Sequence, residues 1–347
     1  MTAPSVSVAL CTYEGARWLP AFLDGLLAQT RPPAELVVSD DGSRDATLEL
    51  VAAFAADAPF PVRISSTPER LGSTFNFAVA FAACTGDLIA PADQDDVWAP
   101  RKLERLAAAM EARGLAMAFS DGTVIDDAGR PVPTTLWEGV GFDAAEQRAF
   151  ARDPLGLLLR RSVVTGAAMM FRSRYLDRLL PFPAALNGPG SLMLQDRWIA
   201  LVLAATAEVG AVAEPLIAFR RHAGQQTGLR APLTTGEVAH QLRRTTTSSA
   251  EGLRTRAAQL DAVRSRLGGH AHPGADDRLA AAVAHLQARA SLPPARPARV
   301  PTVLREWVGG RYRRYTGGAR SAVADLVRPA AEEATPGDGT PLDGPLP

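Results

Sequence analysis

The chain of 347 residues is poor in cysteine and carries no excess of charge of either sign. Only Cys11 and Cys84 occur, each within an apolar segment, where a small buried hydrophobe is expected rather than half of a disulfide. We therefore expect a reducing, cytosolic location. Lys and Arg together number 37, as do Asp and Glu, so the formal net charge is zero and nothing global attracts the chain to nucleic acid.

Long hydrophobic runs and phosphate-binding loops are also missing. No run of about 18 apolar residues occurs, which excludes an obvious membrane-spanning helix. The first residues, MTAPSVSVALCTY, lack a basic region and a long apolar stretch, so we expect no signal peptide. No glycine-rich loop follows the first expected strand, which argues against a dinucleotide enzyme or a P-loop NTPase.

The composition that is present is that of a folded protein with a substantial core. Hydrophobic residues make up 47% of the chain and charged residues 21%. The length allows one large domain and an appendage. Because the composition shifts towards Ala, Arg, Leu and Thr near Leu229, we expect a first domain at residues 1–228, a helical region at 229–330 and a disordered tail at 331–347.

Short apolar strands alternate with helical spacing through the first domain. Strands are expected at 6–10, 36–39, 62–65, 87–90, 116–120, 166–171, 209–212 and 216–220, with a hairpin around 127–129. Helices are expected at 16–29, 45–56, 74–83, from Pro100 onwards, within 138–161, and at 194–205, 237–244, 253–267 and 277–290. Strands that alternate with helices predict a parallel α/β sheet with crossover connections.

Three polar clusters follow expected strands: Thr12 to Glu14, Asp40 to Ser43, and Asp93 to Asp96. In open parallel sheets, ligands bind outside the carboxyl ends of the strands, so the clusters are expected to meet at one site. Asp93 and Asp95 are two residues apart, which places their carboxylates on the same side of an extended segment. Mg²⁺ typically takes one or two protein carboxylates and completes its shell with water and phosphate oxygens. Taken alone, such an acidic loop is more often a solvated turn or a helix cap than a metal site.

Six stretches stand out by their order along the chain: VSVALCTYEGARWLPAFLDGLLAQT, ELVVSDDGSRDAT, GDLIAPADQDDVWAPRKL, VVTGAAMMF, LQDRWIALVL and FRRHAGQQTG. Together they make residues 5 to about 228 resemble a family 2 glycosyltransferase of the GT-A fold. The DQDDVWAPRKL form, with LGSTFNF upstream, most resembles the rhamnosyltransferase-like branch that acts on bacterial surface polysaccharides.

The resemblance implies a fold and an activity. The fold is α/β, a GT-A-like nucleotide-sugar-binding sheet flanked by helices, with a helical C-terminal extension. The activity is inverting, metal-dependent transfer of a sugar, by preference rhamnose, from a dTDP- or UDP-sugar to a cell-surface polysaccharide or a lipid-linked glycan. The cofactor is Mg²⁺ or Mn²⁺. A metal-bound nucleotide diphosphate is a good leaving group, so the reaction then needs one base.

The resemblance also assigns roles to residues. Asp196 would be the catalytic base, Asp95 would ligate the metal, and His222 would supply a further metal or diphosphate contact. Donor binding falls on polar residues and glycines of the other stretches: Thr12, Tyr13, Glu14, Asp41, Gly42, Asn76, Asp93, Gln94 and Gly166. The first three would line the nucleoside pocket, Asp41 would bind the base, and Asp93 would contact ribose or a metal-bound water. Family members usually carry an acidic residue or His before the base, whereas this chain has Gln195.

Each role has a structural alternative. Asp41, Gly42 and Ser43 also suit a turn and a helix N-cap, and Asp196 suits a helix-capping acid. A lone histidine is often structural, and Gly166 also suits a tight turn. A donor-binding role is less certain for Asp40 than for Asp41, and Asp96 would only orient its loop. Trp98 would either flank the donor or belong to the core. Arg220 and Arg221 would pair with the diphosphate as an alternative to His222.

The segment 305–328 combines arginines with Trp307, Tyr312 and Tyr315. It is either a solvated helix face or a patch that docks on anionic lipid at the inner face of the cell membrane. Two rival functions remain open. A nucleotidyltransferase that makes nucleotide sugars also has a parallel sheet and metal-binding acids, and a non-catalytic scaffold of polysaccharide assembly would use the basic C-terminal region to recruit enzymes.

Overall fold

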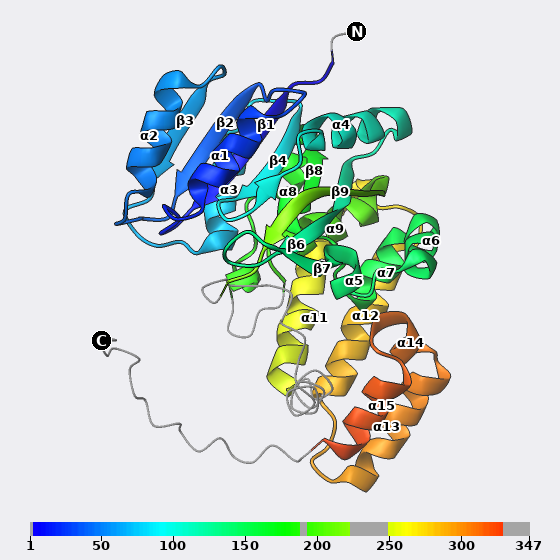
Figure 1. Cartoon of the computed structure of the whole chain (residues 1–347). Coiled ribbons are helices and arrows are strands. Elements are labelled where there is room, and N and C mark those ends of the chain that lie inside the picture. The colour runs from blue at the N-terminus through cyan, green and yellow to red at the C-terminus, as the bar shows by residue number, and fades with distance from the viewer. Residues whose placement is uncertain (1–2, 188–192, 223–248, 329–347) are drawn as a thin grey trace, which may run out of the picture.

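A computed structural model describes residues 3–187, 193–222 and 249–328 of the chain (Figure 1). One sheet runs through the first part in the order β3, β2, β1, β4, β8, β6, β9, β5, and β7 pairs with β6 outside this path. Helices surround the sheet, and a group of C-terminal helices extends from one end of the molecule (Figure 1). The expected domain boundary at 228, the expected helix 237–244 and the expected tail 331–347 lie outside the described residues.

The first half of the sheet is parallel, as predicted. It consists of β1 (Val6–Thr12), β2 (Glu35–Asp40), β3 (Val62–Ser66) and β4 (Leu88–Asp93). The helices α1 (Leu19–Leu27), α2 (Thr47–Asp57) and α3 (Ser73–Ala83) connect these strands. All seven residues of β1 are buried, as expected for a central strand covered on both faces.

The second half of the sheet is mixed, so the expected parallel pairing does not extend through it, whereas the hairpin expected around 127–129 is formed by the antiparallel strands β6 and β7. It contains β5 (Val97–Trp98), β6 (Met117–Ile125), β7 (Pro131–Thr135), β8 (Met169–Arg172) and β9 (Val209–Arg220). β8 runs antiparallel to both β4 and β6, whereas β9 runs parallel to β6. A buried apolar strand has the same side-chain pattern in either direction, which is why its sequence did not reveal this.

Three expected elements also differ in extent. The strands expected at 209–212 and 216–220 form one strand, β9, whose pairing with β6 shifts register between Ser120 and Gly122. The strand expected from Gly166 begins only at Met169, after a 3-10 turn at Gly166–Ala168. The helix expected within 138–161 is divided into α5 (Leu136–Gly139), α6 (Ala144–Arg152) and α7 (Pro154–Arg160). Asp143 and Asp153 accept backbone N–H groups as N-caps, so each starts a new helix.

Three more helices complete the first part: α4 (Lys102–Arg113), α8 (Leu176–Leu179) and α9 (Gln195–Thr206). α4 packs against β6 and β9, and α9 packs against α7 and α8. Ten of the twelve residues of α9 are buried, so this helix runs through the core.

The C-terminal helices continue the same core. α11 (Ala250–Ser265) and α12 (Ala275–Ala290) pack against each other, and both contact α9. Their Leu260 and Leu279 belong to the hydrophobic cluster that includes the strands of the sheet. No helix among the described residues is both long and apolar enough to cross a bilayer.

The last three helices enclose a small second core. They are α13 (Arg296–Val308), α14 (Arg311–Tyr315) and α15 (Ala319–Val327), which meet around Val303, Tyr312 and Ala322. Beside this core, the Arg289 guanidinium donates to Asp325 at 2.6 Å, and the Tyr312 hydroxyl donates to the same carboxylate at 2.7 Å. Both members of the ion pair are almost fully buried.

Replacing Asp325 with Ala should therefore lower the free energy of unfolding by about 3–5 kcal/mol, because the Arg289 charge is left buried without a partner. Urea unfolding followed by circular dichroism measures this change. As a control, Asp261→Ala removes a carboxylate that is 62% exposed and pairs with Arg264, where a loss of about 0–1 kcal/mol is expected. Equal losses in the two variants would contradict the importance of the buried pair.

Candidate active site

A cavity of about 560 Å³ opens at the carboxyl ends of β1, β2 and β4. This is the position at which a parallel sheet binds a ligand. Eleven of the twelve residues expected to act in the site line it: Thr12, Tyr13, Glu14, Asp41, Asn76, Asp93, Gln94, Asp95, Gly166, Asp196 and His222. The fold thus brings to one cavity side chains that lie far apart along the chain.

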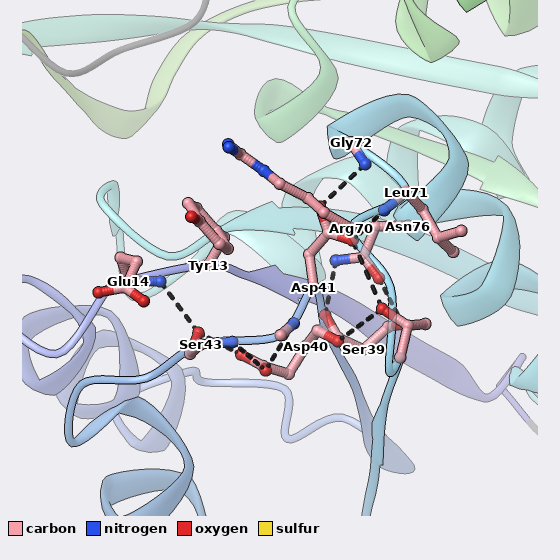
Figure 2. A network of polar contacts seen from close by, with 12 residues as sticks. Tyr13, Glu14, Ser39, Asp40, Asp41, Ser43, Arg70, Leu71, Gly72 and Asn76 are labelled. Atoms are coloured by element: carbon pink, nitrogen blue, oxygen red, sulfur yellow. Dashed lines mark hydrogen bonds and ion pairs between the residues drawn. The ribbon is translucent and has the colours of Figure 1, made fainter. Parts of the chain in front are cut away.

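Gly42 is the residue of that set that does not line the cavity. Its φ of 82° is in the left-handed region that favours glycine, and its N–H donates to Asp40 at 3.1 Å. Asp40 is fully buried and also accepts from the Thr12 hydroxyl at 2.7 Å. It accepts from the Ser43 N–H at 2.8 Å (Figure 2). Asp40 and Gly42 therefore hold the turn after β2, and Asp41 is the residue of that turn that reaches the cavity.

Asp41 is tied to the loop that precedes α3. Its carboxylate accepts from the N–H groups of Leu71 at 2.6 Å and Gly72 at 2.9 Å (Figure 2). The same carboxylate accepts from the Thr67 hydroxyl at 3.4 Å. Because an ionised carboxylate has about four acceptor positions, one position stays available for a further donor such as a nucleobase N–H.

Tyr13 and Arg70 form a stacked pair at the cavity. The Arg70 guanidinium carbon lies 3.9 Å from the centre of the Tyr13 ring, and its Nε lies 3.9 Å from Oδ2 of Asp41 (Figure 2). Arg70 is 56% exposed, so its charge is accessible to a ligand. The sequence alone does not single out Arg70, since one arginine in a loop carries no pattern that separates it from a solvated arginine.

The loops after β1 and β4 are joined by Gln94. Its side-chain amide accepts from the Tyr13 N–H at 2.9 Å and donates to the Tyr13 carbonyl at 2.7 Å. A Cβ at Gly15 would lie 1.9 Å from Oε1 of Gln94, so a larger residue there would displace this side chain from Tyr13. Gln94 thus acts on the Tyr13 backbone and positions that residue.

Glu14 adopts an uncommon backbone conformation beside this loop. Its φ is 48°, which is costly for a residue other than glycine. The Ser43 hydroxyl accepts from its N–H at 2.9 Å, and its carboxylate accepts from the Arg44 N–H at 2.8 Å. Such strain is concentrated at functional sites, which agrees with the position of Glu14 at the cavity.

Asn76 reaches the cavity from α3, but its amide is engaged within the protein. Its Nδ2 donates to the Ser39 carbonyl at 2.8 Å, and its Oδ1 accepts from the Ser39 hydroxyl at 2.6 Å (Figure 2). These bonds attach α3 to the end of β2.

Asp95 and His222 are in direct contact. Nε2 of His222 lies 2.9 Å from Oδ2 of Asp95, and neither side chain is more than 15% exposed. The ring of Trp18 stacks on His222 with a centroid distance of 4.0 Å. His222 follows β9, so the tertiary fold delivers it to an acidic loop that lies 127 residues earlier.

The other acids of this loop differ in their surroundings. Asp93 ends β4, and burial, followed by the charges of Asp95 and Asp196, raises its pKa to about 7. Asp96 does not line the cavity, and instead accepts the Arg220 N–H at 3.0 Å. Burial raises the pKa of Asp96 well above its usual range. Asp96 therefore connects the loop to β9, while Asp93 and Asp95 face the cavity.

Asp196 lies in the first turn of α9 and lines the same cavity as the loops after β1 and β2. Its carboxylate accepts from the Arg197 N–H at 2.6 Å, and burial raises its pKa above the usual value. Leu194 is the N-cap of α9 and makes no side-chain cap hydrogen bond, so Asp196 is an acid of the first helical turn, where the helix dipole favours negative charge, and it also lines the cavity. Gly166 is adjacent, since a Cβ there would lie 3.5 Å from Cβ of Asp196.

Three residues for which the sequence left two roles open do not line the cavity. Trp98 is buried against Phe22, and the Lys102 ammonium lies 3.3 Å from its ring centre, so it is a core residue. Arg220 donates through Nε to the Asp95 carbonyl at 2.8 Å and so supports the acidic loop. Arg221 donates its N–H to the Ile125 carbonyl at 2.9 Å.

The cavity also includes residues that the sequence did not indicate. They extend its walls on the sides of α1, α3, α5 and α9, and are Cys11, Trp18, Arg70, Ser73, Leu136, Val140, Thr165, Leu194, Gln195 and Phe219. Apolar members such as Leu136 and Phe219 resemble core residues in the sequence. Gln195, which departs from the family pattern, accepts from the Thr74 hydroxyl at 3.3 Å.

The contact between Asp95 and His222 fits one divalent cation. A carboxylate oxygen and an imidazole nitrogen 2.9 Å apart are close enough to share an ion. Within the described ranges, no group of three or more His, Cys, Asp or Glu side chains is arranged to hold a metal ion. A cation here would therefore take the rest of its shell from water and substrate phosphates, as Mg²⁺ commonly does.

A family model described as Glycosyl transferase family 2 matches residues 7–180. Among curated proteins, an uncharacterized glycosyltransferase of Nostoc sp. is 30% identical over 135 residues, which cover 39% of this chain and 41% of that protein. The shared segment is thus less than half of that relative's length.

Two solved structures are similar along nearly the whole chain. TarS 1-349 of S. aureus in complex with UDP aligns with a TM-score of 0.51 and 14% identity, covering 93% of this chain and 89% of that one. The mannosyltransferase PcManGT of Pyrobaculum calidifontis, in complex with GDP-Man and Mn²⁺, aligns with a TM-score of 0.52 and 19% identity, covering 94% and 87%. At these identities the likeness concerns the fold.

Proposed function

Because the chain belongs to glycosyl transferase family 2, we propose that it transfers a sugar from a nucleoside-diphosphate donor to a hydroxyl group of a glycan, with inversion at the anomeric carbon. The expected GT-A fold is confirmed by the likeness to two glycosyltransferase structures. The observation that carries the proposal is that Asp196 lines the same cavity as the Asp95 and His222 pair.

The nucleoside end of the donor occupies the side of the cavity formed by Thr12, Tyr13, Glu14 and Asp41. Asp41 accepts a hydrogen bond from the base, and Arg70 offers its charge to the phosphates. The stacking of Arg70 on Tyr13 supports this arrangement, since the ring holds the guanidinium in place.

Replacing Arg70 with Gln should weaken the binding of UDP or dTDP about tenfold, which corresponds to ~1.4 kcal/mol. Isothermal titration calorimetry with Mn²⁺ present measures this change. The matched control is Arg17→Gln. Arg17 also lies over an aromatic ring, at 5.3 Å from the centre of Trp18, and is 64% exposed, but it does not line the cavity. If both variants kept wild-type affinity, the placement of the phosphates beside Arg70 would be wrong.

Asp95 and His222 hold Mg²⁺ or Mn²⁺ in this proposal. When bound, the cation neutralises the charge that develops on the departing diphosphate. Asp93, beside Asp95 in the cavity, contacts the ribose or a water of the metal shell. Gly166 leaves room for the sugar next to Asp196.

Asp196 acts as the general base. Its carboxylate takes the proton of the acceptor hydroxyl while the acceptor oxygen forms a bond to the anomeric carbon of the sugar. The bond from that carbon to the diphosphate oxygen breaks, and its electron pair leaves with the nucleoside diphosphate. One displacement of this kind inverts the configuration. Burial raises the pKa of Asp196, which makes it a stronger base than an exposed aspartate.

The donor we propose is dTDP-rhamnose or a UDP-sugar, and the acceptor is a cell-surface polysaccharide or a lipid-linked glycan at the inner face of the cell membrane. The rhamnose preference rests on the resemblance of DQDDVWAPRKL to the rhamnosyltransferase-like branch. A panel of nucleotide sugars, tested with Mn²⁺ by thermal shift and by donor hydrolysis, determines the donor. Selective stabilisation and hydrolysis of a different sugar would replace rhamnose.

Product analysis separates this function from its rivals. Glycosyl transfer releases free dTDP or UDP from the donor, whereas a nucleotidyltransferase running in reverse with diphosphate releases a sugar phosphate. A non-catalytic scaffold should show no metal-dependent thermal stabilisation by either nucleotide. Sugar phosphate as the product, or no stabilisation at all, would reject the proposal.

A further inference from the structure

Exposed apolar side chains are concentrated on two C-terminal helices. Among the described residues, eight large hydrophobic side chains are at least 41% exposed, and two of these, Leu27 and Ile64, lie singly on α1 and β3. The other six are Val300, Leu304, Trp307 and Val308 on α13, and Val323 and Val327 on α15. We call these six residues the apolar patch. Isolated apolar residues on a surface are ordinary, whereas a cluster indicates a binding surface.

The patch members on α13 follow helical spacing. Val300, Leu304, Trp307 and Val308 stand at i, i+4, i+7 and i+8, which places them on one side of the helix. Val303 of the same helix turns inward to the small second core. α13 therefore has two apolar faces, and the described part of the chain covers only one of them. α13 and α15 pack against each other and lie at the opposite end of the molecule from β3 (Figure 1).

The segment that contains the apolar patch is also rich in arginine. Residues 296–328 contain eight arginines and two acids, Glu306 and Asp325, a net charge of +6 in a chain whose total is zero. Both acids are buried in ion pairs with Arg311 and Arg289 respectively. The surface of this segment therefore presents positive charge beside the apolar patch.

The structure changes which residues form this surface. Tyr312 is 1% exposed and Tyr315 6%, so the two tyrosines expected at a membrane interface belong to the interior. Trp307 remains outside, at 46% exposure, and the surface begins earlier, at Val300. The patch could not be located from the composition of 305–328 alone.

We propose that the apolar patch docks on a bilayer of anionic lipid, with Trp307 and the aliphatic side chains at the acyl boundary and the neighbouring arginines on headgroup phosphates. Aliphatic residues and Trp on one face, flanked by arginines, have the chemistry of an interfacial helix. A second copy of the chain is a poorer occupant, because two such positively charged surfaces would repel each other. This docking is linked to the proposed function at one point: a lipid-linked acceptor would lie at the same membrane surface.

Flotation of the full-length protein with vesicles tests this docking without donor or acceptor. Wild-type protein should float with vesicles of phosphatidylcholine and phosphatidylglycerol and remain unbound with phosphatidylcholine alone. Binding should weaken as salt is added, because arginine attraction to lipid is screened. Leu304→Asp combined with Val308→Asp should lower the bound-to-free ratio at least about tenfold.

The matched control is Leu27→Asp, since Leu27 is 50% exposed and Leu304 57%, and it should float like wild type. Thermal unfolding verifies that the double variant is folded, and Trp307→Gln provides a second test should it unfold.

Equal flotation of wild type and patch variants would overturn the proposal, as would wild type that floats with neither vesicle. A dimer in sedimentation that the double variant loses, without flotation, would assign the patch to self-association instead. Loss of transfer activity with normal flotation concerns the proposed function and leaves this inference intact.

Discussion

Replacing Asp196 with Asn should lower kcat for sugar transfer by about 10²–10⁴-fold while the dissociation constant for the nucleotide stays unchanged, because the base acts only on the acceptor. Asn keeps the shape of the side chain and an oxygen that can accept the Arg197 N–H, which Asp196 accepts at 2.6 Å. The helix start is therefore preserved, and the loss reports the missing carboxylate. Steady-state assays of nucleotide release and calorimetry of nucleotide binding separate the two effects.

The pH dependence of the wild-type enzyme should follow the same residue. Burial raises the pKa of Asp196, and a general base works only when it is unprotonated. The value of kcat/KM should therefore fall as the pH is lowered through this raised pKa, and the residual activity of Asp196→Asn should lack that acidic limb. Asp276→Asn, at a carboxylate that is 54% exposed on α12, is the control and should behave as wild type. Near-normal transfer by Asp196→Asn would remove Asp196 from the mechanism.

Replacing Asp95 with Ala should abolish the metal dependence of nucleotide binding and lower turnover by about 10³-fold, or ~4 kcal/mol. Asp95 is in contact with His222, so its loss leaves the imidazole without the neighbour that completes the pair. His222→Ala should weaken metal affinity by about 100-fold or more, because loss of a residue that only hydrogen-bonds to a metal ligand already costs about 10- to 100-fold. Thermal shift with UDP or dTDP over a Mn²⁺ titration measures both.

The control for Asp95 is Glu111→Gln on α4, which removes a carboxylate that is 46% exposed and pairs with Arg172. Its response to metal and nucleotide should match wild type. Wild-type protein treated with a chelator should behave like Asp95→Ala. Full turnover in the chelator would contradict the metal site, even if Asp95→Ala were inactive for another reason.

The parallel half of the sheet was predictable because its signals are local. A strand buried on both faces reads as an apolar run, and a covering helix reads as apolar spacing near 3.6 residues. The expected strand 36–39 is β2 (Glu35–Asp40), and the expected helix 74–83 is α3 (Ser73–Ala83). The boundaries differ by one residue because neighbouring segments extend the hydrogen-bonded ladder and the first helical turn.

Strand direction and the two-residue strand β5 (Val97–Trp98) were not predictable. An apolar run does not encode direction, so β8 joined the sheet antiparallel although its composition fits a parallel strand. β5 forms because Val97 and Trp98 meet Ala218 and Ile217 of β9, which lie 121 and 119 residues later in the chain. Such pairings depend on contacts that no short window of sequence contains.

The candidate site was predictable in its residue types but not in its geometry. The acidic cluster after β4, Asp196 and His222 were identified from their motifs, and all three contribute to one cavity. The distance of 2.9 Å between His222 and Asp95 depends on the register in which β9 pairs with β6. The stacking of Arg70 on Tyr13 depends on the loop held by Asp41.

The sequence by itself determined which segments are buried and which chemical groups are available: carboxylates after β2 and β4, an aspartate at the start of α9, and arginines near the C-terminus. The resemblance favoured Asp41 and Asp95 over their neighbours, but only the tertiary structure decided the contacts that separate the two acids of each pair. Asp41 lines the cavity while Asp40 binds the turn, and Asp95 lines it while Asp96 binds β9. Neighbouring side chains at the end of a strand point in different directions, and their partners come from segments distant in the sequence, so the choice between them is made by packing and not by residue type.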